Sequence, residues 1–257
     1  MLSCFFFIGG TIIGSFLNVC IYRMPLSKSV VAPGSHCVHC GHVLAWYENV
    51  PLLSFFFLRG KCSACHKRIS IRYATVELIT GILFAALYRQ FGFCPELFIF
   101  ILMSCGLVLA TFIDFDHQLI PDTVSFGGLA LGLASSFFFP RIIGCSDGKA
   151  GVLQSFYGAL AGGASIYLIG ALGKVLFKKD AMGFGDVKFL AMIGSFLGWQ
   201  KILLVFFVAP FFGAAVGIFL KIRYKVETIP YGPYLSLAAI VAIFWGDRLL
   251  DLLMHWW

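Results

Sequence analysis

Residues 97–114 read LFIFILMSCGLVLATFID, an apolar run that ends in a carboxylate, Asp114. A bilayer core of about 30 Å needs roughly 20 consecutive apolar residues in a helix, and no charged side chain interrupts this run before its last residue. The run therefore predicts a membrane-spanning helix. An ionisable side chain is costly at membrane depth, so we expect Asp114 to line a polar cavity or to take part in chemistry.

The whole chain shares this apolar character. Of its 257 residues, 60% are hydrophobic and 12% are charged, and the mean hydropathy is +0.93. One soluble core could not bury so much apolar surface, so we expect an all-α polytopic membrane protein. The net charge of +7 would fit nucleic-acid binding, but no basic stripe interleaved with aromatic residues is present. We expect the lipid bilayer as a partner and no nucleic acid.

Hydropathy predicts about eight membrane-spanning helices. The predicted spans are residues 4–22, 74–92, 96–114, 123–140, 151–173, 185–199, 201–221 and 231–253. The sixth is short and begins at a glycine-rich motif, so it could instead start part-way into the membrane. The chain then has three parts, namely a first membrane helix in 1–22, a small domain in 23–73 and a seven-helix membrane domain in 74–257.

The basic residues indicate an orientation. With eight spans, residues 23–73, 115–122, 174–188 and 221–230 form loops on one side of the membrane, and most Lys and Arg residues fall in them. The exceptions are Arg89, Arg141, Lys149, Lys201 and Arg248. By the positive-inside rule the basic loops are cytoplasmic, and both termini face outward. The first span has no convincing cleavage site and is expected to be retained.

Four cysteines are patterned, as the pairs Cys37/Cys40 and Cys62/Cys65 in the only segment of soluble character. Two CxxC pairs separated by residues 41–61 are typical of a zinc ribbon, in which four thiolates bind one structural Zn²⁺. Disulfides or a redox motif are the alternatives, but a cytoplasmic loop is kept reduced. We therefore predict a small cytoplasmic zinc-ribbon-like domain between the first two membrane helices.

Histidines crowd these cysteines, and any of them could replace a thiolate, although four thiols already complete a closed structural site. They are His36, His39, His42 and His66. The turns of the two pairs are expected to use Gly41 and Lys67. Because the segment has few apolar residues, the metal should supply much of its stability. The remaining cysteines are expected to act as small hydrophobic residues. They are Cys4, Cys20, Cys94, Cys105 and Cys145.

A second aspartate, Asp186, closes the motif Gly183-Phe184-Gly185-Asp186. The glycines lack a Cβ atom and allow a positive φ, so a peptide backbone could approach closely beside the carboxylate. Alone, Asp186 could simply cap the sixth helix. Two carboxyl groups within a few ångströms cannot both ionise readily, so one keeps a proton while the other takes one from water. Together with Asp114, the motif predicts the chemistry of an aspartic protease.

The residues around Asp114 include further carboxylates. Asp122 follows Ile120-Pro121 and is predicted to be the N-cap of the fourth helix. Asp116 lies deeper in the loop and should be better hydrated, and its part in the chemistry stays open. His117 stands beside Asp116 without a matching nucleophile, so no other catalytic set competes with the aspartate pair.

Several stretches in order resemble the type IV prepilin peptidases, a family of GxGD-type intramembrane aspartic proteases. Together they extend over almost the whole chain. Besides the CxxC pairs they are Gly14-Ser15-Phe16-Leu17-Asn18-Val19, Tyr22-Arg23-Met24-Pro25, Glu48-Asn49-Val50-Pro51-Leu52, Arg72-Tyr73, Val76-Glu77-Leu78, Ile113-Asp114-Phe115-Asp116-His117-Gln118-Leu119-Ile120-Pro121-Asp122, Met182-Gly183-Phe184-Gly185-Asp186-Val187-Lys188 and Ile229-Pro230-Tyr231-Gly232-Pro233-Tyr234.

The resemblance implies a function and a place. It implies that Asp114 and Asp186 are the catalytic residues, the same pair that the apolar run and the glycine motif indicate. Family members of the bacterial inner membrane cut prepilins of type IV pili, or pseudopilins of type II secretion and competence systems, after the Gly of a short basic leader. Members that carry the four-cysteine loop commonly also methylate the new N-terminal amine with S-adenosylmethionine. Both activities are expected here.

The methyl-donor site cannot be located from the sequence. Glu48, Gly60 and Glu77 are candidates from the matched stretches, although loop turns and a carboxylate at the membrane boundary explain them equally well. Asn18 and Arg23 could orient the substrate or anchor the first helix.

Two other functions fit part of the pattern. A channel or transporter with a zinc-stabilised cytoplasmic module would use Asp114 and Asp186 to bind or relay cations. The chain lacks matching Gly/Pro-broken spans in its two halves, which disfavours a transporter. A peptidase without methylation would keep the zinc loop as a scaffold only.

Overall fold

The computed structural model describes residues 1–178, 182–224 and 229–254. Parts of the predicted loops 174–188 and 221–230 lie outside these ranges. The described chain is helical and has no strand, apart from two isolated antiparallel bridges in the cysteine segment. The expectation of an all-α membrane protein with a small cysteine domain after the first membrane helix is confirmed.

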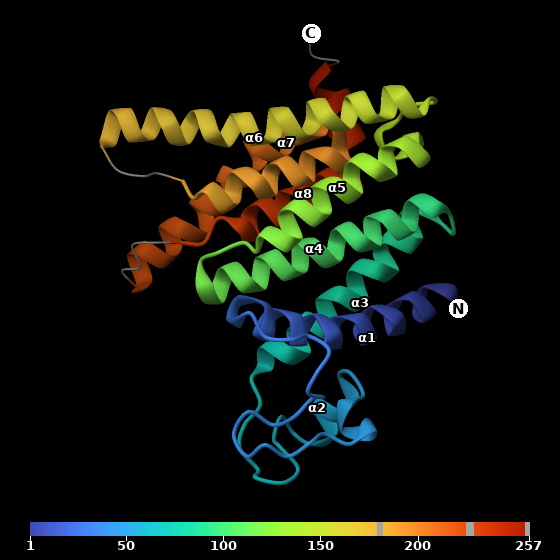
Figure 1. Ribbon diagram of the computed structural model, residues 1–257, viewed down its shortest axis with the longest axis vertical. Helices are drawn as coiled ribbons and strands as arrows, with labels where there is room; N and C mark the ends of the chain where they lie inside the picture. The colour runs from blue at the N-terminus through green and yellow to red at the C-terminus, as the bar shows by residue number, and fades with distance from the viewer. Residues whose placement is uncertain (179–181, 225–228, 255–257) are drawn as a thin grey trace. The chain divides into compact units, whose positions relative to one another are not determined.

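Each predicted span coincides with a helix or half of one (Figure 1). The long helices are α1 (Leu2–Arg23), α3 (Ile71–Phe91), α4 (Pro95–His117), α5 (Asp122–Phe138), α6 (Gly148–Phe177), α7 (Phe184–Tyr224) and α8 (Gly232–Met254). The short ones are η1 (Met24–Leu26), η2 (Trp46–Asn49), α2 (Leu53–Phe57) and η3 (Pro140–Ile143). The sixth and seventh predicted spans are the two halves of α7, which Gly198 separates with a φ of 76° and a ψ of 173°.

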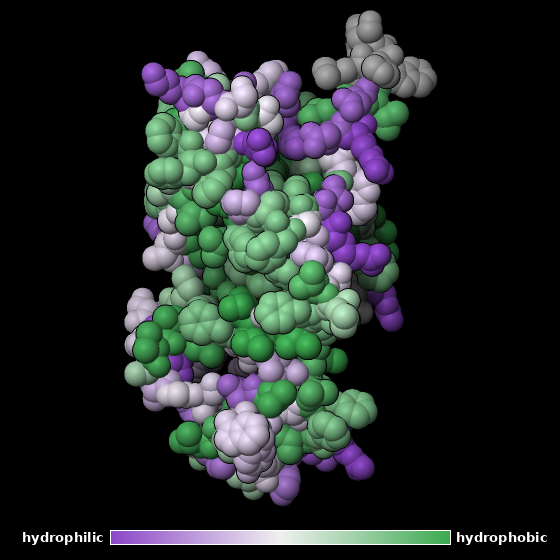
Figure 2. Space-filling view, turned by 90° about the vertical axis from the view of Figure 1, so that its right-hand side faces the viewer, coloured by the Kyte–Doolittle hydropathy of each residue, from purple (hydrophilic) through white to green (hydrophobic). Residues whose placement is uncertain are grey.

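Length and composition mark five helices of the described chain as able to cross a membrane, namely α1 with η1, α3, α4, α6 and α7. Helix α5 has 17 residues, fewer than the roughly 20 that span a bilayer core. Large apolar side chains are exposed on α6 and α7, such as Leu172 and Phe211. Much of the face in Figure 2 is hydrophobic, as expected for a surface that contacts lipid.

The chain divides into two compact units, Met1–Leu109 and Ala110–Trp257. In the first unit, α1 packs along α3 because glycines bring the two backbones together. A Cβ atom at Gly10 would lie 2.7 Å from the carbonyl oxygen of Thr80, and one at Gly14 would lie 2.8 Å from the Cα atom of Glu77. Small residues at this spacing let membrane helices approach closely. The cysteine segment connects the ends of this helix pair (Figure 1).

In the second unit, the first half of α7 packs against both α5 and α6. The side chains of Phe189, Ile193 and Phe196 are buried. The Ser155 hydroxyl of α6 donates a hydrogen bond to the carbonyl oxygen of Ser195 on α7 at 2.6 Å. The sixth predicted span is therefore buried in protein, and it ends where Gly198 breaks the helix.

Alanine substitutions of Gly9 and Gly10, two neighbouring residues of α1, should distinguish the effect of helix packing on stability from the effect of helix propensity. Alanine favours a helix over glycine by about 1 kcal/mol, and a Cβ atom at Gly9 would meet no atom within 4 Å. Gly9→Ala should therefore leave the melting temperature unchanged or raise it. Gly10→Ala should lower it, since overpacking costs about 1–3 kcal/mol. Thermal unfolding in detergent would measure both, and equal melting temperatures would contradict the packing.

Candidate active site

Asp114 lies near the C-terminal end of α4, and its side chain is buried. Its Oδ2 atom accepts a hydrogen bond from the backbone N–H of Gly232, the first residue of α8, at 2.8 Å. A Cβ atom at Gly232 would lie 2.8 Å from the same oxygen, so a larger residue would push against the carboxylate. The start of α8 thus holds Asp114 in place, and this contact needs a glycine.

Asp186 lies in the first turn of α7, which begins at Phe184. It is not the N-cap residue itself, but its carboxyl group forms a hydrogen bond with the backbone of Gly183, just before the helix. Neither Gly183 nor Gly185 adopts a positive φ. The conformational freedom expected of these glycines is not used, and Gly185 instead packs beside Ile120, where a Cβ atom would lie 3.6 Å from the Ile120 Cβ.

The two aspartates are brought together from distant parts of the sequence. The carboxyl groups of Asp114 and Asp186 interact electrostatically. Ile120 lies next to both segments, since a Cβ atom at Gly232 would also come within 3.3 Å of its Cδ1 atom. Tyr231, directly before α8, interacts electrostatically with Asp186 as well. The end of α4 and the starts of α7 and α8 therefore meet at one carboxylate pair.

The neighbouring acidic residues lie differently. Asp116 is exposed, two positions along α4 from the buried Asp114 and so nearly on the opposite face. The prediction that Asp122 caps the fourth helix is wrong, because the N-cap of α5 is Pro121 and no side chain caps the helix. The helix starts one residue earlier than expected, and the Asp122 carboxylate pairs instead with Lys188 of α7. This ion pair joins the starts of α5 and α7.

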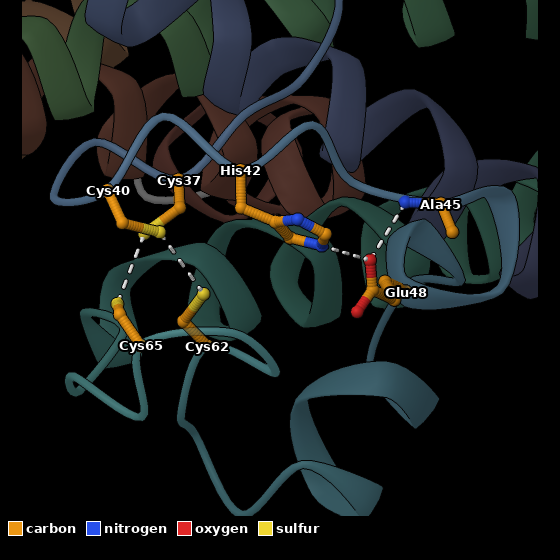
Figure 3. A network of polar contacts seen from close by, with 7 residues as sticks. All are labelled: Cys37, Cys40, His42, Ala45, Glu48, Cys62 and Cys65. Carbon is orange, nitrogen blue, oxygen red and sulfur yellow. Dashed lines mark hydrogen bonds and ion pairs between the residues drawn. The ribbon is translucent and has the colours of Figure 1, made fainter.

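The four patterned cysteines form a compact cluster in the first unit. Figure 3 shows the first pair facing the second. The Sγ atoms of Cys37 and Cys65 are 3.9 Å apart, those of Cys40 and Cys62 are 4.0 Å apart, and all four lie within 4.8 Å of one another. A tetrahedral zinc site with Zn–S bonds of about 2.3 Å has sulfur atoms about 3.8 Å apart. None of the cysteines forms a disulfide within the described residues.

The two cysteine pairs are built alike. An isolated antiparallel bridge encloses each pair, between His36 and Val43 for the first and between Lys61 and Arg68 for the second. The residue directly after each pair has a positive φ, 72° at Gly41 and 55° at His66. Lys67 also serves the second turn, since its carbonyl oxygen accepts a hydrogen bond from the N–H of Cys62 at 3.0 Å, but the position that matches Gly41 is His66, one residue earlier.

Backbone N–H groups favour the thiolate at two of these sulfur atoms, those of Cys37 and Cys62. The N–H groups of His39 and Cys40 lower the pKa of the Cys37 thiol to about 7. The pKa of Cys62 is lowered in the same way by N–H groups of its own turn. The N–H of His42 also lowers the pKa of Cys40, but burial and the other cysteine sulfurs outweigh it, so that this pKa rises to about 11. Four thiolates this close together need a bound cation.

The histidines near the cysteines are not part of the cluster within the described residues. His42 instead lies 3.1 Å from the Glu48 carboxylate through its Nε2 atom. Glu48 also accepts a hydrogen bond from the N–H of Ala45 at 2.8 Å. The pKa of Glu48 is lowered, first by a hydrogen bond from Ser63 and then by the one from Ala45.

The other candidates from the matched stretches tie the cysteine segment to the membrane helices. Glu77 of α3 is buried and accepts a hydrogen bond from the N–H of Leu52 at 2.8 Å. Arg23 donates hydrogen bonds to the carbonyl oxygens of Ser29 and Pro33. Gly60 has a φ of 66° and packs beside an aromatic ring. Each of these residues has a structural role in the first unit.

Comparison with known proteins agrees with this arrangement. Residues 8–91 match the family described as "Bacterial Peptidase A24 N-terminal domain", and residues 100–218 match the "Type IV leader peptidase family". The chain belongs to the type IV leader peptidase family. The two matched regions contain the cysteine cluster and the aspartate pair, respectively.

Curated members of this leader peptidase family resemble most of the chain. A Myxococcus xanthus protein named "Prepilin leader peptidase/N-methyltransferase" is 41% identical over 218 residues, which are 85% of this chain and 63% of the relative. A Stutzerimonas stutzeri protein of the same name is 36% identical over 93% of this chain and 89% of its own length. The Pseudomonas aeruginosa protein of that name is 34% identical over the same shares. No solved structure matches the chain.

The sequence did not predict one contact of the aspartate pair, the hydrogen bond from Gly232 to Asp114. Gly232 lies in the stretch Ile229–Tyr234, and no feature of this stretch in the sequence points to Asp114. The available signal was a Gly-Pro pair, Gly232-Pro233, at the start of a long helix. Only the fold shows that its N–H donates to a carboxylate more than a hundred positions earlier.

Proposed function

We propose that this chain is a membrane-embedded aspartic endopeptidase that removes the leader from type IV prepilins or pseudopilins, with Asp114 and Asp186 as the catalytic pair. The observation that carries this proposal is the meeting of the two carboxyl groups, one of them buried and anchored by Gly232. Membership in the type IV leader peptidase family supports it and does not favour a cation channel or transporter.

The pair can act as an acid and a base. One carboxylate takes a proton from a water molecule, and the water oxygen attacks the carbonyl carbon of the scissile peptide bond. The other carboxyl group gives its proton to the carbonyl oxygen, where negative charge develops. Collapse of the intermediate breaks the C–N bond, and the leaving amine takes up a proton. The N–H of Gly232 donates a hydrogen bond to Oδ2 of Asp114. This bond orients the carboxyl group and leaves its Oδ1 atom available for the reaction.

We place the protein in the bacterial inner membrane, with the cysteine segment and both aspartates on the cytoplasmic side and both termini outward. The distribution of basic residues supports this orientation. A basic leader on the cytoplasmic side would reach the aspartates while the apolar helix of its prepilin stays in the bilayer. The cut would then follow the Gly that ends the leader.

The cysteine segment, residues 23–73, would form a structural zinc module with Cys37, Cys40, Cys62 and Cys65 as ligands. The short distances among the four sulfur atoms support this role. A site closed by four thiolates holds shape and leaves no open position for catalysis. Zinc would replace the hydrophobic core that such a short segment lacks.

We further propose that the protein methylates the new N-terminal amine of its product. The curated relatives carry "N-methyltransferase" in their names, and they resemble the cysteine segment as well as the peptidase part. S-adenosylmethionine would supply the methyl group. If the module serves only as a scaffold, the product would keep an unmodified amine, and the mass of its N-terminal peptide distinguishes the two cases.

Asparagine variants test the aspartate pair. Asp114→Asn and Asp186→Asn should each lower the rate of prepilin cleavage by roughly 100-fold or more, because an amide can neither take nor give the proton. Asp116→Asn should keep most of the rate, since this side chain is exposed away from the pair. Mass spectrometry of a prepilin mixed with the purified protein would measure all three rates. Full cleavage by either of the first two variants would exclude that residue from catalysis.

Gly232→Ala tests the anchor of Asp114. The new methyl group would lie against Oδ2, so the carboxylate must move and its hydrogen bond must lengthen. We expect cleavage to slow about tenfold or more, since displacement of a catalytic group raises the barrier. Gly127→Ala is the control, because a Cβ atom there meets nothing within 4 Å. The same cleavage assay applies, and equal rates for the two variants would show that the contact is dispensable.

Metal analysis tests the zinc module. The purified protein should contain about one zinc per chain, and a chelator that removes it should lower the melting temperature. Cys62→Ser should lose the zinc, whereas Cys145→Ser should keep it because Cys145 lies outside the cluster. Elemental analysis of the two variants gives the result. A metal-free wild-type protein with full stability would contradict the proposal.

A further inference from the structure

The cysteine segment contains an apolar run that a soluble domain would not leave on its surface. Residues 50–58 read VPLLSFFFL and carry no charged side chain. Helix α2 lies within this run, and there Leu53 is exposed while Phe56 and Phe57 are 77% and 76% exposed. Large apolar side chains gathered on one surface mark a contact with a membrane or with another protein. The run is too short to cross a bilayer, so at most it enters one leaflet.

The structure places this run beside the membrane-spanning part of α1. The N–H of Leu52 donates to Oε2 of Glu77 at 2.8 Å, and a Cβ atom at Gly14 of α1 would lie 2.8 Å from the Cα atom of Glu77. Leu52 therefore lies near the level of Gly14, which is about 13 Å along the helix from Arg23, the last residue of α1. In Figure 1, α2 accordingly lies below the middle of α1 and not beyond its C-terminal end.

An apolar groove lies between α1 and the start of the run. Its volume is about 670 Å³, and it is lined mostly by apolar side chains of α1 and of residues 49–53. Ile8, Ile12 and Phe16 line it from α1. They are spaced four residues apart, so they share one face of the helix, and all three are exposed. In a membrane helix such a face contacts lipid, and acyl chains can therefore fill this groove.

The backbone of the run is suited to an apolar environment. Lipid offers no hydrogen-bond partner, so a segment enters it only when its backbone groups are paired within the protein. Pro51 has no N–H group, and the N–H of Leu52 is bonded to a side chain. The N–H groups of Ser54, Phe56 and Leu58 donate to carbonyl oxygens of the run itself, at 2.9–3.0 Å.

Glu77 fixes the point where the run turns. The N–H of Leu53 donates to the carbonyl oxygen of Pro51 at 2.6 Å, which closes a γ-turn around Leu52. Leu52 has a φ of 61° and a ψ of −47°, a conformation that is rare and strained outside glycine. Such a turn persists where its surroundings hold it, and the buried carboxylate of Glu77 holds this one through the N–H of Leu52.

The residues on either side of the run suit the lipid headgroups. Trp46 and Tyr47 precede it, and both are exposed. Trp and Tyr are enriched at the boundary between a membrane and water. Arg59 and Lys61 follow the run and are exposed as well. Long basic side chains reach from the edge of an apolar segment to the headgroups, so both ends of the run have anchors for this boundary.

We propose that residues 50–58 form a re-entrant segment in the membrane leaflet that adjoins the Arg23 end of α1. Acyl chains of that leaflet cover Phe56 and Phe57 and fill the groove beside α1. Glu77 holds the segment at this depth, while the two cysteine pairs stay outside the bilayer. The inference goes beyond the peptidase and methyltransferase functions and depends on neither.

Photo-crosslinking tests where the run lies. A benzoylphenylalanine in place of Phe57 reacts under ultraviolet light with the C–H bonds next to it. In vesicles of phosphatidylethanolamine and phosphatidylglycerol, the full chain with this label should form about fivefold or more lipid adduct than the chain labelled at Val38, because an inserted side chain contacts acyl chains. Val38 is the control, since it is exposed but lies between Cys37 and Cys40. Mass spectrometry of the labelled peptides measures the adduct.

Two variants of the chain labelled at Phe57 test the anchor. Glu77→Ala should lower the lipid adduct about threefold or more, because the N–H of Leu52 loses its partner and an unpaired N–H is costly in lipid. Glu77→Gln should keep the wild-type amount, since its amide oxygen can still accept this hydrogen bond. Zinc content within about twofold of wild type would show that both variants are folded.

Each outcome identifies what covers the run. Equal lipid adducts at Phe57 and Val38 would overturn the proposal, and so would crosslinks from Phe57 mainly to a second copy of the chain. An unchanged adduct in folded Glu77→Ala would exclude Glu77 as the anchor. If Glu77→Ala fails to fold, the comparison of Phe57 with Val38 decides. These measurements need neither prepilin nor a methyl donor, so they do not bear on the two activities.

Discussion

The hydrogen bond from the N–H of Gly232 to the carboxylate of Asp114 is the contact on which the candidate active site depends. A carboxylate that is 5% exposed needs partners inside the protein, because burial without them is costly. The first N–H groups of a helix lack partners within that helix, so the start of α8 can supply one. Only glycine permits the approach, and thus a single position couples the last helix to the end of α4.

The first half of α7 supports that arrangement through its packing. It is enclosed by α5 and α6, and its first turn carries Asp186. The ion pair between Lys188 and Asp122 and the contact of Gly185 with Ile120 hold the same turn against the segment that follows Asp114. Protein also covers the backbone where α7 breaks, because Gly198 is buried.

In the first unit, close helix packing and buried hydrogen bonds hold the cysteine segment in place. Glycines on α1 let it lie closely along α3, and the pair provides a base for a segment too short to have a core of its own. Hydrogen bonds from Leu52 to Glu77 and from Arg23 to two carbonyl oxygens connect that segment to the helices. The four cysteine sulfur atoms lie close together at the centre of the segment. The apolar groove lies where α1 and this segment meet.

The sequence by itself determined the helices, the cysteine cluster and the two aspartates to examine, because hydropathy, CxxC spacing and a carboxylate at the end of an apolar run are local signals. Only the tertiary structure decided that Gly232 holds Asp114, that Asp122 pairs with Lys188 instead of capping α5, and that the sixth span is enclosed by protein. It also placed Leu52 beside Glu77. These features depend on contacts between residues far apart in the chain, and side-chain partners at that separation leave no pattern in a single sequence.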